Sequence, residues 1–186
     1  DNLASVLDAA PVATLVFDSN KRVILANPAA QRMFQQPDTA LVGQPCGALL
    51  HCVNHRAEPG GCGTGPDCAS CPINVALDLA LASSETTVLE EGAALRAADD
   101  RQGEALVRRT TGTDLWVNYR VNPMVLDGER RAVMALDDVT ARRRAQDELA
   151  AERRLLRTVI DNLPDAIYAK DAQGRKTLAN QADVDN

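Results

Sequence analysis

An internal repeat is the feature that most constrains how this chain can fold. Residues 3–30 and residues 156–183 align without a gap at an offset of 153, and eleven aligned pairs are identical. Accidental likeness between two short hairpins would not give so many identities. The repeat predicts one complete structural unit followed by the opening of another. The chain also starts at Asp1 rather than Met, so we expect it to be a piece of a longer protein.

The first unit has the pattern of an α+β domain. Alternating or continuous apolar runs bounded by turn residues predict five strands, at residues 13–17, 22–26, 104–109, 114–122 and 132–136. Helices are predicted at residues 2–9, 28–34 and 72–82. Asn27 is the expected N-cap of the second helix, with Pro28 in its first turn. The "LDGE" run at 126–129 predicts a hairpin turn, whereas residues 85–103 give no clear pattern.

A charged, helix-forming segment follows, from Val139 to Leu163. Its apolar residues approach heptad spacing, with one interruption at Glu152; they are Ala145, Leu149, Leu156, Val159 and Leu163. Such a helix could lie on its own domain or could form a parallel two-stranded coiled coil. The coiled coil is favoured because the helix joins two similar units and has few apolar neighbours. We therefore expect a homodimer through this helix, with Leu149, Leu156, Val159 and Leu163 in the interface.

Two stretches resemble the PAS family of sensor domains. "AAPVATLVFDSNKRVILANPAAQRMF" is similar to a PAS opening, with Pro11, Asp18 and Asn27 where that family often has them. "GTDLWVNYRVNPMVLDGERRAVMALDDVTARRRAQDEL" is similar to a PAS ending, in which the family's Asp-Ile-Thr triplet appears as Asp138-Val139-Thr140. The resemblance covers residues 3–146, and residues 156–183 for the second copy.

The resemblance implies a PAS fold, which is a five-stranded antiparallel sheet with flanking helices, followed here by a long C-terminal signalling helix. Four segments follow from this interpretation. They are a PAS sensor domain at 1–138, a cysteine-rich insertion within it at about 44–71, a signalling helix at 139–163, and the start of a second PAS domain at 164–186. A fold by itself does not assign a ligand or a signal.

The triplet lies where the last strand passes into the helix. Asp138 or Thr140 can cap that helix, so a shift in the sheet would pass to the helix through a few hydrogen bonds. We expect these two residues to relay a signal to a downstream output domain. The usual partners of the family imply a histidine kinase or a diguanylate cyclase as the parent protein.

All five cysteines fall within 26 residues of one another, in a glycine-rich stretch. Four of them, Cys52, Cys62, Cys68 and Cys71, have the spacing C-x9-C-x5-C-x2-C. A C-x2-C turn presents two sulfurs to one ion, and glycines let the backbone approach a metal or cluster. The pattern "GCGTGPDCASCP" also resembles a cysteine-bearing subgroup of PAS domains. These residues predict a four-cysteine metal centre, with an iron–sulfur cluster and zinc both left open.

Other interpretations of this stretch are weaker. Cys46, His51 and His55 are spare candidate ligands. A disulfide or a redox thiol pair is less favoured, because the cysteine number is odd and no secretory signal is present. Inert thiols are also possible. A flavin photosensor of the superfamily would carry an Asn-Cys-Arg-Phe-Leu-Gln run, which is missing, and haem would leave four clustered cysteines unexplained.

Composition excludes several classes of function. The formal net charge is −6, which argues against general nucleic-acid binding and attraction to an anionic membrane surface. No apolar run approaches a membrane span and no signal peptide opens the chain, so we expect a cytoplasmic module, though the parent could be membrane-tethered. No phosphate-binding loop, Gly-x-Ser-x-Gly or His-Glu-x-x-His motif occurs, so no catalysis is expected. The remaining alternatives are a small-ligand-binding PAS domain with structural zinc, and a dimerisation spacer.

Overall fold

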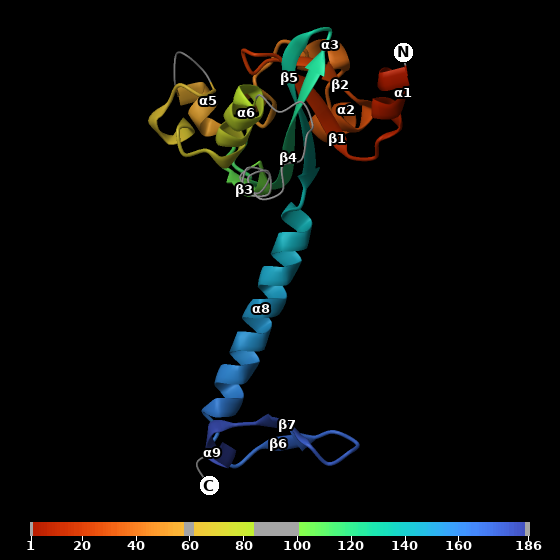
Figure 1. Ribbon diagram of the computed structural model, residues 1–186. Helices are drawn as coiled ribbons and strands as arrows, with labels where there is room; N and C mark the ends of the chain where they lie inside the picture. Colours follow the sequence, from red (N-terminus) through yellow and green to blue (C-terminus); the bar gives the residue numbers. More distant parts are fainter. Residues whose placement is uncertain (1, 58–61, 84–100, 185–186) are drawn as a thin grey trace. The chain divides into compact units, whose positions relative to one another are not determined.

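The computed structural model describes residues 2–57, 62–83 and 101–184 (Figure 1). The chain divides into two compact units, Asp1–Thr140 and Ala141–Asn186. Nearly all of the buried apolar core lies in the first unit. No helix in the described ranges combines the length and the apolar character needed to cross a membrane.

The first unit is built on the predicted five-stranded antiparallel sheet, in the order β2-β1-β5-β4-β3. The strands are β1 Ala13–Phe17, β2 Val23–Ala26, β3 Gln102–Val107, β4 Leu115–Leu126 and β5 Glu129–Asp138. The continuous apolar run at 132–136 lies in β5, which is the central strand as expected. Burial alternates along this run, because Ala132, Met134 and Leu136 face the core and are buried while Val133 and Ala135 on the other face are half-buried.

Strand β4 has the alternation that its sequence indicates, and it forms a hairpin with β5. Leu115, Val117, Tyr119 and Val121 are buried, and the residues between them are half-buried or exposed. Two residues, Asp127 and Gly128, join the strands, and both have positive φ (54° and 75°). Positive φ at both positions is typical of the type I′ turn, whose twist matches that of the paired strands.

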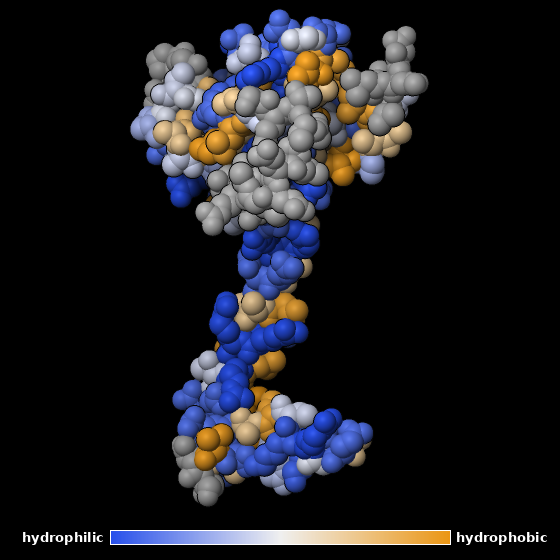
Figure 2. Space-filling view, in the orientation of Figure 1, coloured by the Kyte–Doolittle hydropathy of each residue, from blue (hydrophilic) through white to orange (hydrophobic). Residues whose placement is uncertain are grey.

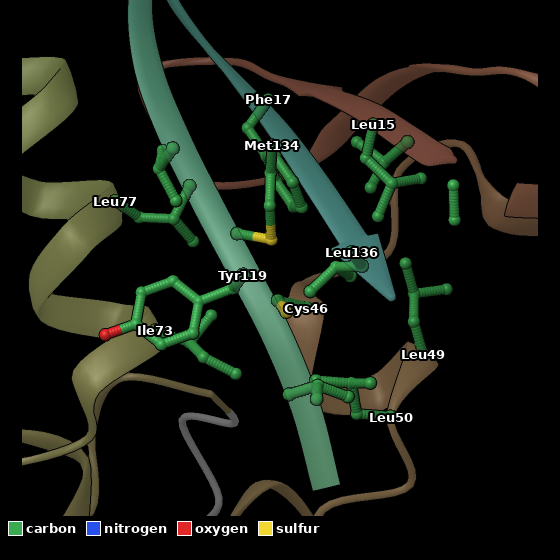
Figure 3. Packing of buried hydrophobic residues seen from close by; sticks show 14 of the residues in the cluster. Leu15, Phe17, Cys46, Leu49, Leu50, Ile73, Leu77, Tyr119, Met134 and Leu136 are labelled. Carbon is green, nitrogen blue, oxygen red and sulfur yellow. The ribbon is translucent and has the colours of Figure 1, made fainter. Parts of the chain in front are cut away.

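Seven helices of the first unit surround this sheet within the described residues. They are α1 Asn2–Ala9, α2 Pro28–Phe34, α3 Asp38–Leu41, α4 Cys46–Leu49, α5 Val53–Ala57, the 3₁₀ helix η1 Pro66–Cys68, and α6 Pro72–Ala82. Helix α6 packs on β3, β4 and β5, and α2 packs on β1. Figure 3 shows Ile73 and Leu77 of α6 directed toward the strands that carry Tyr119 and Met134. These apolar contacts form the main core.

Asn27 ties the start of the first unit together. Its Oδ1 accepts hydrogen bonds from Thr14 N and Ala30 N, both at 2.9 Å. Its Nδ2 lies within 3.0–3.2 Å of the carbonyl oxygens of Leu7, Ala10 and Val12. The predicted N-cap is therefore confirmed, and the same side chain also fixes the end of α1 against β1.

Asn180 does the same in the second unit, at the predicted offset of 153. Its Oδ1 accepts from Ile167 N at 2.8 Å and from Asp183 N at 3.0 Å. Its Nδ2 lies within 2.8–3.4 Å of the carbonyls of Ile160, Leu163 and Asp165. All five partners are the counterparts of those of Asn27, so the repeat in the sequence is also a repeat in the structure.

The second unit holds most of a long helix and a small hairpin. Its elements are the greater part of α8 Thr140–Asp161, then β6 Tyr168–Lys170, β7 Lys176–Ala179 and α9 Gln181–Val184. Helix α8 contains no buried residue, and β6 is exposed throughout. The predicted helix at 139–163 is thus present over 140–161.

Two predicted strands have different ends in the structure. Arg22 lies outside β2 because it pairs with Pro45 and its Nη1 donates to Gly43 O at 2.8 Å. The strand expected at 104–109 covers Gln102–Val107. Residues 108–109 leave the sheet because Arg108 O accepts from Val53 N at 2.9 Å and Arg109 bridges Cys52. Of the unassigned segment at 85–103, residues 84–100 lie outside the described part.

Candidate functional site

A cavity of about 350 Å³ lies between α4, α5, the cysteine stretch and α6. All five cysteines line it, so we name it the thiol cavity. Its apolar wall is formed by Leu50, Ile73, Leu77 and Val107. Cysteines separated by up to 25 positions in the chain are therefore brought to one site, as the clustered spacing predicted.

Local structure places each thiol differently. Cys46 is the first residue of α4, and Cys52 lies immediately before α5. Cys68 is the last residue of η1, and Cys71 is the N-cap position of α6, with Pro72 as the first helical residue. Cys62 is half-buried in the segment between α5 and η1. All five are free thiols.

Cys46 belongs to the apolar core as much as to the cavity. Its side chain is 4% exposed and lies among the core residues labelled in Figure 3. Burial raises the pKa of this thiol well above its ordinary value, and the neighbouring Cys62, Cys71 and Cys52 raise it further. A buried thiol without a cationic partner stays protonated.

Cys62 lies against Gly47 of α4. A Cβ added at Gly47 would come within 2.8 Å of the Cys62 sulfur and within 3.1 Å of the His55 Cβ. Only glycine fits at this position without a shift of these side chains. Burial raises the pKa of Cys62, and the backbone amide of Gly47 opposes that rise by hydrogen bonding to the sulfur.

The structure separates the two histidines. His55 lines the thiol cavity, and its Nδ1 is buried without a hydrogen-bond partner in the described structure. His51 has a left-handed backbone (φ 52°) and lines a second cavity of about 260 Å³, together with Arg109 and Asp138. His55 thus shares the thiol cavity with the cysteines, whereas His51 lines the second cavity.

A polar bridge crosses one side of the thiol cavity. Lys21 Nζ donates to Asn74 Oδ1 at 2.9 Å and forms an ion pair with Asp78 at 2.5 Å. Asn74 Nδ2 donates to Cys68 O at 3.2 Å. The bridge therefore connects the β1–β2 turn, the cysteine stretch and α6. Sequence reasoning missed Lys21, Asn74 and Gly47, because their roles depend on contacts between residues up to 57 positions apart.

The four predicted ligands are near one another, yet they are not arranged around a point. Among the described residues, no three His, Cys, Asp or Glu side chains are placed to hold one metal ion. Soft sulfur donors and an unpartnered imidazole nitrogen are the right chemistry for a metal such as zinc. A metal centre would thus require the ligand segments to move toward each other.

The predicted relay residues lie at the β5–α8 junction. Asp138 Oδ1 accepts from Thr140 N at 2.9 Å, and Thr140 Oγ1 accepts from Trp116 N at 2.9 Å. Val139 N donates to Trp116 O at 2.9 Å. Asp138 therefore caps the start of α8, whereas the Thr140 hydroxyl attaches the start of α8 to β4 instead.

The predicted interface residues of the helix are exposed. Leu149, Leu156, Val159 and Leu163 have exposed fractions between 42% and 54%. Leu155, which the heptad reading did not include, is 64% exposed. Figure 2 shows apolar side chains interrupting the charged surface of the long helix.

Comparison with known proteins gives one family and many structural likenesses. Residues 1–66 match the family model described as "PAS domain". No curated protein matches the chain significantly. Similar solved structures include the PAS domain of BvgS from Bordetella pertussis, at 16% identity and TM-score 0.49, covering 82% of this chain and 95% of that one. Another is the PAS domain of nitrogen regulation protein NR(II) from Vibrio parahaemolyticus, at 18% identity and TM-score 0.43, covering 74% and 98%.

A third likeness is to the PAS domain of an HTR-like protein from Haloarcula marismortui, at 14% identity and TM-score 0.45, covering 74% of this chain and 88% of that one. Likenesses of this size carry no argument about ligands. The family model and the five-stranded sheet with its flanking helices agree with each other. Residues 1–66 thus match the PAS domain family, and the first unit of this chain has a PAS fold.

Proposed function

We propose that the PAS domain is the cytoplasmic input module of a signalling protein and detects a redox, gas or small-molecule signal at the thiol cavity. The candidate ligands of a metal centre there are Cys52, Cys62, Cys68 and Cys71. The observation that carries the proposal is that every cysteine of the chain lines one cavity. An unselected set of thiols would be scattered over core and surface.

Two centres remain candidates for this donor set. An iron–sulfur cluster would supply a redox- or gas-sensitive group, and zinc would supply a structural lock. The residues themselves provide the sulfur donors, the apolar wall that limits water, and the Gly47 amide directed at the Cys62 sulfur. Haem and flavin remain disfavoured as cofactors.

The relay begins at α6, because Cys71 directly precedes this helix and α6 packs on β3, β4 and β5. A change at the centre moves the start of α6 against the sheet. The displacement continues along β5 to Asp138 and Thr140, whose hydrogen bonds fix the first turn of α8. Ligand-dependent packing of this kind shifts a population between two states.

The output passes through α8 as a homodimer. The exposed apolar side chains of this helix have no partner that would bury them within the described residues. Association along Leu149, Leu156, Val159 and Leu163 would remove that apolar surface from water. Residues 164–186 are the start of a second PAS domain, and a histidine kinase or diguanylate cyclase domain is the output of the parent. The fragment itself performs no catalysis and binds no nucleic acid.

A second function has one observation in its favour. The cavity volume lies in the range of small-molecule sites, which suits a PAS domain that binds a small ligand and uses zinc only to lock its cysteine stretch. A dimerisation spacer is the third alternative and assigns no role to the cavity.

Anaerobic purification with elemental analysis tests the proposal. We expect about one metal centre per chain, with visible absorption and inorganic sulfide for a cluster, or a colourless zinc protein. Cys68→Ser with Cys71→Ser should lose the metal, whereas Cys46→Ala, at the core position, should keep it. A wild-type chain that folds and dimerises without metal under these conditions would refute the metal centre. The dimerisation spacer and a metal-free small-ligand site would then be the remaining functions.

A further inference from the structure

The sequence around the thiol cavity contains a second ligand pair of the same spacing. Cys52 and His55 form a C-x2-H pair, and Cys68 and Cys71 form a C-x2-C pair. Zinc sites are typically built from two such pairs, each held by one tight turn. Counting cysteines alone hides the first pair, because its second member is a histidine.

The first pair is held at the start of α5. Cys52 immediately precedes the helix and His55 lies three residues further, so both belong to one face of that turn. The backbone there is fixed, since Cys52 N donates to Gly47 O at 2.9 Å and Val53 N donates to Arg108 O at 2.9 Å. Both side chains line the thiol cavity.

The second pair is held at the start of α6. Cys71 N donates to Cys68 O at 3.3 Å, which closes the turn between them. The same carbonyl accepts from Asn74 Nδ2 at 3.2 Å. Each pair is thus attached to a different wall of one cavity, and their sulfurs and imidazole border the same space.

His55 has a polar atom that the described structure leaves unexplained. Its Nδ1 is buried and has no hydrogen-bond partner, a state that usually signals an ion or a water. Cys62 belongs to no C-x2 pair, and its sulfur already accepts a hydrogen bond from the Gly47 backbone amide. His51, which borders the other cavity, offers a control of the same residue type.

We propose that the thiol cavity is a zinc site with the mixed ligand set Cys52, His55, Cys68 and Cys71, in which Cys62 is not a ligand. The inference rests on the proposed metal centre and selects its ligands and its metal. Because no three of these side chains surround one point among the described residues, a zinc site would require the two pairs to approach each other across the cavity. Zinc binding and closure of the cavity would then be one event, in which the start of α6 approaches α5.

Cobalt(II) and zinc titration of the reduced 186-residue chain tests this assignment. Cobalt occupies tetrahedral zinc sites, and its thiolate charge-transfer absorption increases with the number of sulfur ligands. We expect one ion per chain and the spectrum of three thiolates with one nitrogen. His55→Ala should weaken zinc binding by more than the ~10–100-fold typical of an outer-shell change. His51→Ala and Cys62→Ser should bind as the wild type does.

His55→Cys is a control for the possibility that His55→Ala loses zinc only because it misfolds. It should bind one cobalt with stronger charge-transfer absorption, because a fourth thiolate replaces the imidazole. If His55→Ala binds normally and Cys62→Ser does not, the set is all-sulfur, and this inference is wrong while the proposed centre stands. Iron and inorganic sulfide in the purified wild type would also show that the zinc assignment is wrong while the proposed metal centre stands. A wild-type chain that binds no metal at all would refute the proposed centre itself.

Discussion

The two copies of the repeat make the same hydrogen bonds and bury very different amounts of apolar surface. Asn27 and Asn180 have matching sets of five partners. Strand β1 is nevertheless buried throughout, whereas its counterpart β6 is exposed throughout. Local hydrogen bonding is thus specified by about 28 residues, while burial needs the remaining strands and helices of a domain. A lone two-stranded hairpin is marginally stable in water.

The turn of each copy shows the same difference at one residue. Lys21 has φ 58°, and Gly174, at the equivalent position, has φ 80°. Glycine adopts this conformation without steric cost, whereas lysine does not. Lys21 can compensate in the first unit because Asp78 and Asn74 lie within reach of its ammonium group. Tertiary contacts therefore support a residue that the turn alone would disfavour.

The largest test of this comparison removes one equivalent side chain from each copy. Leu15 of β1 is fully buried, and Tyr168 of β6 is 54% exposed. Leu15→Ala should lower the free energy of unfolding by about 3 kcal/mol, as large-to-small core changes do. Tyr168→Ala should change it by less than about 0.5 kcal/mol. Denaturant unfolding measures both, and equal effects would contradict the difference in burial.

The next test removes the asparagine of each copy. Asn27→Ala leaves the buried amides of Thr14 and Ala30 without their acceptor, so we expect a loss of about 2–3 kcal/mol from the first unit. Asn180→Ala should leave that transition unchanged and abolish hydrogen-exchange protection of the β6–β7 amides. If Asn180→Ala also destabilised the first unit, the two copies would not be independent.

Alkaline pH should lower the stability of the first unit through its thiols but not that of the second unit, which contains no cysteine. Burial raises the pKa of Cys46 in the folded state. Its contribution is therefore complete below about pH 8.5, the ordinary thiol pKa, and is lost as pH rises and the unfolded chain releases its proton first. The slope approaches ~1.4 kcal/mol per pH unit for one thiol. Cys46→Ala should reduce this slope of the unfolding free energy against pH, as measured by denaturant unfolding at a series of pH values from about 8.5 upward.

The smallest expected effect lies in the turn of the second copy. Hydrogen bonds from the backbone and side chain of Arg175 lower the pKa of Asp171. Arg175→Ala should raise that pKa toward its ordinary value, as followed by NMR of the carboxyl carbon. The turn's contribution is present above the unfolded pKa and is lost as pH falls through the folded one. Because the carboxyl is exposed, the unfolding free energy should not change measurably; a large loss would mean that the hairpin depends on this turn.

Much of the fold could be predicted from the sequence. Helices 28–34 and 72–82, the β4 alternation and the hairpin turn at 126–129 follow from local chemistry, namely capping, periodicity and turn residues. Strand ends were less accurate, because Arg22 and residues 108–109 pair with segments distant in the sequence. Residues 84–100, for which the sequence gave no pattern, lie outside the described part.

The candidate site likewise has features that the sequence predicted and features that depend on contacts between distant residues. The spacing of Cys52, Cys62, Cys68 and Cys71 identified the segment, since clustered thiols are visible in any linear reading. Spacing could not show which histidine lies beside the cysteines. His51 and His55 are only four positions apart in the sequence, yet they line different cavities. The roles of Gly47 and Asn74 depend on packing between elements that the sequence does not order.

The sequence by itself determined the repeat, the asparagine cap, the strand and helix periods and the presence of one thiol-rich segment. These are short-range properties, set by propensity and by hydrogen bonds within about thirty residues. Only the tertiary structure decided which histidine joins the thiols, and that Lys21 reaches Asp78. Those outcomes depend on which distant surfaces are brought together and removed from water, a condition that no local pattern contains.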